Sequence, residues 1–323
     1  MKVSLFISVA LLVISSVQAQ DVEAVGKSPW GPDDEIGTLN MMSETSKLKT
    51  LSKISSGKVY DLSVDYFVGM PSFDVLGDPG YQYWLTHTPH GTIVDNPNGL
   101  GTDMNEKVSY TGDAISMYTH MGTHIDALNH FGLNGRIWNG FTPEEHLGDK
   151  GWKKTGAETI PPIISRGVLI DIAKAKGSLP SNYRITTNDL QIALKEQGTK
   201  LEKGDVVLIR TGQAQFYEDA NQYLDNYPGI SLDAVRWLVE DQKIMILGAD
   251  NLSLEAFPPE REDNWVPVHT YLLAEKGVMF IEQMFLEELS GDSIYEFAII
   301  AASLKLRGAS GSPMRPMAIP IRN

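Results

Sequence analysis

The amino-acid sequence predicts an α/β fold, on three observations. Apolar, β-branched runs alternate with helical patterns through the second half of the chain, as in proteins whose helices cover a sheet. Of the 323 residues, 42% are hydrophobic, which is enough for a sizeable core, although no cysteine is present to form disulfides. No internal repeat, low-complexity block or long linker divides the chain, so we expect one large domain.

Residues 1–19 have the pattern of a signal peptide. Lys2 precedes an apolar stretch from Val3 to Val17, and Ala19 is a small residue suited to cleavage. An uncleaved anchor helix is the alternative, but a serine-interrupted stretch is short for a bilayer, which needs roughly 20 apolar residues. We therefore expect secretion to the periplasm or the extracellular space, no membrane association after cleavage, and one domain over residues 20–323.

Several strands are expected after this segment. Residues 60–119 are rich in turns and in alternating positions, which predicts strands joined by long loops, where substrate sites are often built. Later in the chain, apolar runs predict four buried strands. These strands are expected at residues 167–171, 205–210, 243–248 and 277–282.

Three helices are expected among the later strands, at residues 187–197, 231–242 and 268–276. The first can be capped by Thr186 or Thr187, since a threonine oxygen accepts hydrogen bonds from free N–H groups at a helix start. Gly277 can end the third helix, because glycine readily adopts the left-handed conformation found there.

Charge and composition exclude several functional classes. The chain has 27 Lys and Arg against 41 Asp and Glu, a net charge of −14, and no basic run that could follow a phosphate backbone. We therefore expect no nucleic-acid partner. The sequence lacks the G-x-S-x-G nucleophile motif and the glycine-rich phosphate loops. Without cysteine, any metal site must use histidine and carboxylate ligands.

Three of the seven histidines lie between residues 120 and 130. In an extended chain His120, His124 and Asp126 would project from one face, whereas a helix would separate Asp126 from the histidines. We therefore predict a strand that presents half of a divalent-metal site, since imidazole nitrogen and carboxylate oxygen suit zinc, manganese, iron or nickel. Hydrogen-bonded polar residues in a turn-rich loop are the alternative interpretation.

His130 lies four residues beyond Asp126 and is a candidate general base, because an imidazole titrates near neutral pH. It could instead be a further ligand. A remote contribution is expected from His269, at a helix start, and Glu282, at the end of the following strand, since both can reach the same end of the sheet. This second pair is informative only beside the first cluster.

The pattern His120-x-Gly-Thr-His124-x-Asp126-x-x-x-His130 resembles the signature HxGTHxDxxxH of the cyclase-like family, which includes bacterial kynurenine formamidase and isatin hydrolase. The likeness extends over most of the chain after residue 19. Further segments similar to those of the family are residues 30–40, Gly248 to Asp250 with Glu255, and residues 308–316.

The resemblance implies the family's swivelling β/β/α fold, with a mixed β-sheet and flanking helices. It implies a metal bound by His120, His124 and Asp126, a second metal position shared by Asp126, His269 and Glu282, and His130 as the catalytic base. Isatin hydrolase-like members hold one manganese ion and formamidase-like members hold two zinc ions, so one or two Mn or Zn ions per chain are implied. A homo-oligomer, dimer or larger, is also implied.

The function expected from these residues is metal-dependent hydrolysis of a C–N amide bond in an aromatic or heterocyclic small molecule, isatin-like or N-formylkynurenine-like. The alternatives are a lactonase, a polyketide-type cyclase or dehydratase, and a non-catalytic exported binding protein. An apolar wall around a flat substrate is one interpretation of nearby aromatic residues, and ordinary core packing is the other. These residues are Tyr81, Tyr83, Trp84, Phe131 and Trp138.

Overall fold

The computed structural model describes residues 24–74, 76–177 and 179–322. The predicted signal peptide, residues 1–19, lies outside the described residues. Within the described residues, no helix is both long enough and apolar enough to cross a membrane.

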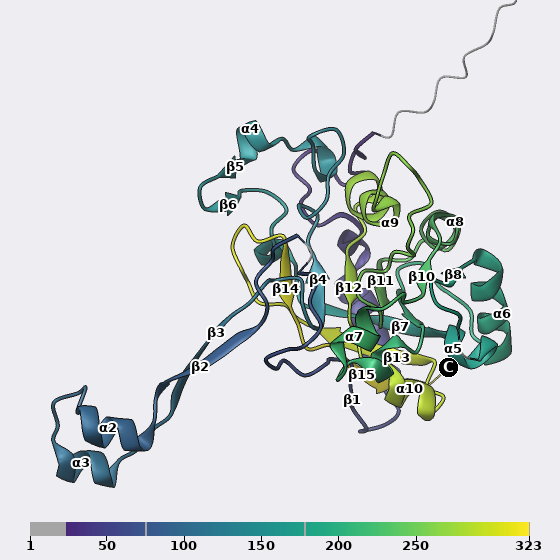
Figure 1. Cartoon of the computed structure of the whole chain (residues 1–323). Coiled ribbons are helices and arrows are strands. Elements are labelled where there is room, and N and C mark those ends of the chain that lie inside the picture. The colour runs from purple at the N-terminus through teal and green to yellow at the C-terminus, as the bar shows by residue number, and fades with distance from the viewer. Residues whose placement is uncertain (1–23, 75, 178, 323) are drawn as a thin grey trace, which may run out of the picture.

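A nine-stranded mixed sheet forms the body of the molecule, with helices packed around it (Figure 1). The strand order is β1-β15-β13-β7-β9-β11-β12-β4-β14, in which β7, β9, β11 and β12 are parallel neighbours and the other pairings are antiparallel. The predicted α/β class with a mixed sheet and flanking helices is therefore confirmed. The strands span Tyr60–Asp61 (β1), His124–Asp126 (β4), Ile163–Asp171 (β7), Val206–Arg210 (β9), Ile246–Ala249 (β11), Phe280–Glu282 (β12), Glu296–Ala301 (β13), Gly311–Pro313 (β14) and Met317–Pro320 (β15).

The four predicted buried strands correspond to β7, β9, β11 and β12. Except for the half-buried Ile164 near the start of β7, their apolar side chains are buried, as continuous hydrophobic runs in a parallel sheet should be. The third strand begins at Ile246 rather than at Lys243, because Lys243 has φ +57° and the chain is still turning there.

The predicted helix at residues 187–197 is α6, Thr187–Gln197. Thr186 caps it, and the Asp189 carboxylate accepts hydrogen bonds from the Thr186 backbone and hydroxyl. Burial disfavours the charged Asp189, but hydrogen bonds from Lys176 and Thr186 outweigh that effect and lower its pKa to about 2. Gly198, with φ +67°, ends the helix.

The other two predicted helices have wider turns than expected. The first consists of α8, Leu232–Arg236, followed by a π-helical turn at Trp237–Asp241. The second consists of α9, Pro267–His269, followed by a π-helix at Thr270–Lys276 that ends at Gly277, φ +63°. His269, one of the predicted metal ligands, therefore lies on the first turn of the second of these helices.

The remaining elements are short. The helices are η1 (Gly37–Met41), α1 (Glu44–Ser52), η2 (Trp138–Gly140), α4 (Pro143–His146), η3 (Ala157–Thr159), α5 (Ile172–Lys176), η4 (Gln213–Phe216), α7 (Ala220–Leu224) and α10 (Glu287–Gly291). Two small sheets outside the main one pair β5 (Leu147–Gly148) with β6 (Gly151–Trp152), and β8 (Arg184–Ile185) with β10 (Gly229–Ile230).

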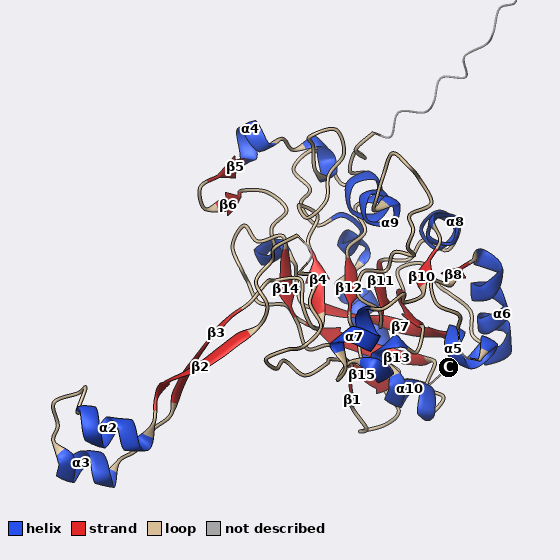
Figure 2. Cartoon of the chain, in the orientation of Figure 1, coloured by secondary structure: helices blue, strands red, loops and turns tan. Residues whose placement is uncertain are grey.

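A long hairpin extends away from the body (Figures 1 and 2). Strands β2 (Gln82–His87) and β3 (Gly112–Ser116) pair antiparallel, and the two helices at the tip are α2 (Pro89–Asp95) and α3 (Thr102–Lys107). The strands expected between residues 60 and 119 are thus β1, β2 and β3. We call residues 76–117 the arm.

Candidate metal centre

The segment that carries the histidine cluster turns before it becomes a strand. Only His124–Asp126 form β4, and Gly122 has φ +59°. A side chain at residue 122 would also meet the ring of Tyr66 at 2.5 Å. The prediction of one extended strand through residues 120–126 is therefore wrong for its first part, because the packing of Tyr66 requires a glycine turn there. His120 reaches the cluster from this turn.

Strand pairing brings the remote residues to the cluster. In the register of β4 with β12, His124 lies opposite Glu282 and Asp126 lies opposite Phe280. Since side chains alternate along a strand, His124, Asp126 and Glu282 share one face. The His124 Nε2 to Glu282 Oε2 distance is 3.4 Å.

Two groups of possible ligands result, and they share one carboxylate. His120, His124 and Asp126 form the first group, and Asp126, His269 and Glu282 form the second. Within each group the ligand atoms lie within 4.8 Å of one another. His120 Nδ1 is 2.7 Å and His124 Nε2 3.2 Å from Asp126 Oδ1, and His269 Nε2 is 3.4 Å from Glu282 Oε1. The structure thus brings together all five residues considered as ligands.

The chemistry of these atoms fits a divalent cation. All five side chains are at most 6% exposed, so water cannot freely solvate their polar atoms. Among the residues that the structure describes, three of those atoms find no hydrogen-bond partner: His124 Nε2, Asp126 Oδ2 and Glu282 Oε1. Leaving buried polar atoms unpaired costs free energy, roughly 1–3 kcal/mol for each group. A cation among them would satisfy these atoms with the ligands that zinc and manganese accept.

Hydrogen bonds hold the histidine rings in place. His124 Nδ1 lies 2.8 Å from the Gly122 carbonyl oxygen, and His269 Nδ1 lies 3.0 Å from Glu255 Oε1. In both rings the outer nitrogen is engaged, and Nε2 is left facing the carboxylates, as in many metal sites. Burial disfavours the charged imidazoles, but the carboxylates beside them, Asp126 and Glu282 for His124 and Glu255 and Glu282 for His269, raise the pKa of both histidines to about 10.

The C-terminal loop holds the remaining ring. His120 Nε2 lies 2.8 Å from Ser310 Oγ, and Gly311 on β14 packs directly against the same ring. Glu255 and Ser310 lie in segments that resemble the cyclase-like family. Their contacts with His269 and His120 could not be predicted from the spacing of these residues in the sequence. The contact of Ser310 with His120 spans 190 residues and that of Glu255 with His269 spans 14, and both arise only from the fold.

His130 lies beside the ligand groups rather than within one of them. Its ring stacks on His120 with centroids 3.7 Å apart, and its Nε2 is 3.5 Å from Asp126 Oδ2. Burial and the neighbouring histidines His120 and His269 lower the pKa of His130 well below its usual range, although Asp126 opposes this shift. The imidazole is therefore neutral near pH 7 and able to accept a proton.

Two neighbouring hollows that share several lining residues lie beside the cluster. The metal-side hollow, of about 80 Å³, is bordered by His120, His130, His269 and Glu282. The adjoining chamber, of about 420 Å³, is largely apolar. Both are lined by Phe73, Leu252, Phe257 and Trp265.

Only one of the five aromatic residues considered for the apolar wall lines these hollows, namely Phe131. Trp138 is buried in the core, and Tyr83 and Trp84 are half exposed on the arm. Tyr81 packs against Tyr66 at a centroid distance of 6.1 Å. The wall is formed instead by aromatic residues from separate loops, which proximity in sequence to the histidine motif could not identify.

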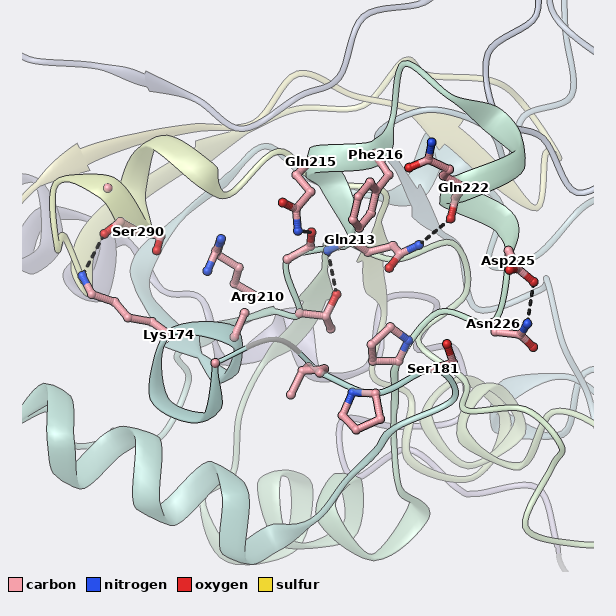
Figure 3. Close-up of a pocket in the computed structure, with 18 residues that line it drawn as sticks. Lys174, Ser181, Arg210, Gln213, Gln215, Phe216, Gln222, Asp225, Asn226 and Ser290 are labelled. Carbon is pink, nitrogen blue, oxygen red and sulfur yellow. Dashed lines mark hydrogen bonds between the residues drawn. The ribbon is translucent and has the colours of Figure 1, made fainter.

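A larger hollow, of about 840 Å³, lies near the ends of β7 and β9 (Figure 3). Figure 3 shows Lys174 and Arg210 toward one end of it and Asp225 and Asn226 toward the other. Arg210 is already paired with Asp171 at 2.8 Å and with Glu287 at 2.6 Å. Neither group of possible metal ligands lines this hollow. The chemistry described above therefore belongs to the smaller hollows.

Comparisons with known proteins all point to one family. The family described as "Putative cyclase" matches residues 60–256. The chain is 26% identical over 260 residues to Cyclase-like protein 3 of Oryza sativa subsp. japonica, covering 80% of this chain and 78% of that protein. It is 27% identical to a kynurenine formamidase of Bacillus thuringiensis subsp. konkukian (strain 97-27), covering 64% of this chain and 79% of that one.

Solved structures agree in fold. A crystal structure described as "a novel cyclase" superposes with a TM-score of 0.80 at 31% identity, covering 92% of this chain and all of the other. Isatin hydrolase A from Ralstonia solanacearum superposes with a TM-score of 0.62 at 22% identity, covering 81% of this chain and 92% of the other. At that identity the second similarity shows the fold alone.

Proposed function

Because this chain belongs to the cyclase family that its residues 60–256 match, we propose that it is a metal-dependent hydrolase of small-molecule amides. The proposed reaction cleaves a C–N amide bond in an aromatic or heterocyclic substrate. Relatives of the chain include hydrolases, among them the kynurenine formamidase and the isatin hydrolase. Their names support the reaction class.

The observation that carries this proposal is the pair of ligand groups that meet at Asp126. Both groups are buried, border a hollow, and leave three polar atoms without hydrogen-bond partners. Such a cluster is costly in a protein that leaves it empty, and it is useful in a protein that binds a cation. We propose Mn or Zn as the metal, with His120, His124 and Asp126 as the first ligand set. His269 and Glu282 would complete a second set.

A divalent metal held by these residues supplies Lewis-acid assistance to attack on an amide carbonyl. We assign proton transfer to His130, whose Nε2 lies 3.5 Å from Asp126 Oδ2 at the edge of the ligand groups. A neutral His130 accepts a proton from the attacking water and returns it to the departing nitrogen, which leaves as an amine. Stacking on the His120 ring, with centroids 3.7 Å apart, holds His130 in place for both transfers.

The shape of the hollows supports a flat, apolar substrate. The metal-side hollow of about 80 Å³ is much smaller than typical ligand pockets of roughly 300–1,000 Å³, so the substrate must extend into the adjoining chamber of about 420 Å³. Phe73, Phe257 and Trp265 border both spaces. In the proposed pose the scissile bond lies beside His130 and an aromatic ring lies between these side chains.

The test is an assay of the purified, Mn- or Zn-loaded protein with isatin and with N-formylkynurenine. Asp126→Ala removes the carboxylate common to both ligand groups and should abolish both metal binding and turnover. Asp233→Ala is the matched control, because Asp233 is a highly exposed residue in the first turn of α8. If the metal-loaded protein leaves both substrates intact, amide hydrolysis of this kind is refuted. The remaining hypotheses are then lactone hydrolysis, cyclisation, and ligand binding without turnover.

We also propose that the protein is exported and cleaved after Ala19, which the pattern of residues 1–19 supports. N-terminal sequencing of the protein recovered outside the cytoplasm should begin at Gln20. An N-terminus at Met1 would contradict cleavage.

A further inference from the structure

Apart from the candidate metal ligands, the lining of the two hollows carries negative charge without a compensating cation. Among the described residues that line them, none is a lysine or an arginine. Besides Glu282, the lining contains Asp78 at the metal-side hollow and Asp74 at the chamber. No described residue forms an ion pair or a side-chain hydrogen bond with Asp74 or Asp78. Both carboxylates are therefore available to a ligand.

Two arginines lie on chain segments next to those that line the chamber, but each already has a carboxylate partner. Arg184 follows the chamber residue Asn182 by two positions, and its Nε is 3.1 Å from Glu260 Oε1. Arg261 Nη2 is 2.8 Å from Asp263 Oδ2. Neither arginine lines the chamber. A substrate carboxylate in the chamber would therefore meet no opposite charge, and an unpaired anion withdrawn from water is unfavourable.

Four aromatic side chains border the chamber, namely Phe73, Tyr227, Phe257 and Trp265. The Tyr227 and Phe257 rings pack edge to face, with centroids 6.3 Å apart and an interplanar angle of 88°. Among the described residues, no lysine or arginine lies over any of these four rings. The negative face of an aromatic ring attracts a cation, and ammonium ligands are held by several such rings in known binding sites. The aromatic lining therefore favours a cationic ligand over an anionic one.

The far end of the chamber, away from the metal-side hollow, contains hydrogen-bond acceptors that lack a donor. The residues that line the chamber alone are Ser72, Asp74, Asn182, Leu224, Asn226 and Tyr227. Ser72 Oγ is buried and finds no hydrogen-bond partner among the described residues. The Asp74 carboxylate can only accept hydrogen bonds. An ammonium group has three N–H donors and no acceptor, so it can bind both of these side chains.

From these observations we infer that the substrate carries a positively charged amine at the end away from the scissile amide, and that the far end of the chamber binds this amine. The inference rests on the proposed hydrolysis, which places the amide beside His130. Phe73, Phe257 and Trp265 border both hollows, so an aromatic ring between them links the amide on the metal side to the amine. The chamber of about 420 Å³ has the size of a small-molecule pocket, roughly 300–1,000 Å³.

The charge of the whole chain acts in the same direction. Its net charge of −14 attracts a cationic substrate from solution and repels an anionic one. Inside the chamber an anionic group would also approach the Asp74 carboxylate, and contacts between like charges lower affinity by about tenfold or more. For substrates of one shape, we therefore expect affinity to fall from the cation through the neutral molecule to the anion.

Three amides built on the same acetanilide frame test this order. The first, 4-(aminomethyl)acetanilide, is cationic near pH 7; the second, 4-ethylacetanilide, is neutral and has nearly the same shape; the third, 4-acetamidobenzenesulfonate, is anionic. Isothermal titration calorimetry measures the Kd of each amide for the metal-loaded protein. The cation should bind at least about tenfold more tightly than the neutral amide, and the anion at least about tenfold more weakly.

Asp74→Asn removes the charge at the chamber and keeps the size of the side chain. It should weaken binding of the cationic amide by about fivefold, the effect of losing one partly exposed charge pair, and leave the Kd of the neutral amide unchanged. Asp233→Asn, at a highly exposed position on α8, is the matched control and should keep all three Kd values. Thermal unfolding establishes that both variants are folded.

Cleavage of each amide is followed separately by chromatography, so the outcome for binding is distinct from the outcome for hydrolysis. If no amide is cleaved but the order of affinities holds, the proposed hydrolysis fails and the preference of the chamber for a cation stands. Equal Kd values for the cationic and neutral amides, or no detectable binding of the cation, would overturn the inference. So would a folded Asp74→Asn variant that binds the cation as tightly as the native protein.

Discussion

Gly311→Ala is a minimal change that should disable the candidate metal centre. A Cβ at this position would lie 2.5 Å from Cε1, 2.8 Å from Nδ1 and 2.9 Å from Nε2 of the His120 ring. Contacts between non-bonded heavy atoms are ordinarily about 3.5–4.0 Å, so the ring must move by roughly 1 Å. The backbone of Gly311 is not in the left-handed region, so the effect is steric rather than conformational.

The ring has little freedom to make that movement. His120 is hydrogen-bonded to Asp126 through Nδ1 and to Ser310 through Nε2, and its ring stacks on that of His130 with centroids 3.7 Å apart. Distances between a metal and its ligands tolerate only about 0.2 Å, so a shift of roughly 1 Å removes His120 as a ligand. Disturbing even an outer partner of a ligand typically costs 10- to 100-fold in metal affinity. We expect Gly311→Ala to weaken metal binding by at least about that factor.

The assay is calorimetric titration of Mn or Zn into metal-free protein, with thermal unfolding as the test of folding. Gly57→Ala is the matched control, because a Cβ at this exposed position has no neighbouring atom within 4 Å. The control should bind metal like the native protein. A folded Gly311→Ala variant with native affinity would refute the argument that His120 is a confined metal ligand.

Three further changes test separate parts of the structure. His130→Ala should keep the native metal content, measured by elemental analysis, while turnover falls by about 100-fold or more, because a general base contributes about that factor. Loss of metal would reassign His130 as a ligand. Glu255→Gln should weaken metal binding roughly 10- to 100-fold in the same titration, because it disturbs the acceptor that orients His269; unchanged affinity would contradict that role. Asp189→Asn should lower the free energy of unfolding by about 2 kcal/mol at pH 6, from the fall in pKa from 3.8 to about 2. Because the pKa of Asp189 is lower in the folded than in the unfolded protein, this difference in stability should vanish as pH falls from about 4 to 2. Urea unfolding measures the free energy of unfolding, with the exposed Asp233→Asn as the control. A difference that does not change with pH would contradict the prediction.

Local signals were sufficient for the parts of the fold that local interactions determine. Helix α6 was predicted to the residue, because Thr186 marks its start by short-range hydrogen bonding. The buried strands β7 and β9 were predicted because a continuous apolar run reports burial on both faces. Their neighbours in the sheet were not predicted, since pairing depends on the whole chain.

The candidate site shows where such signals end. Residue types and spacing pointed to His120, His124, Asp126, His269 and Glu282, and the fold places them together. The conformation between His120 and His124 was mispredicted, because alternation cannot reveal a turn required by a distant tyrosine ring. Of the aromatic wall only Phe131 was predicted. The arm was not predicted, because neither periodicity nor composition reports which elements lack a covering layer.

The pairing of β14 with β4 gives the cluster a place in the order of synthesis. Ser310 and Gly311 contact His120, and Ser310 follows His120 by 190 residues, so the histidine motif is synthesised well before them. A nascent chain therefore carries His120, His124 and Asp126 long before the residues that hold them in place are available. The cluster therefore reaches its final arrangement only after β14 has been synthesised and has paired with β4.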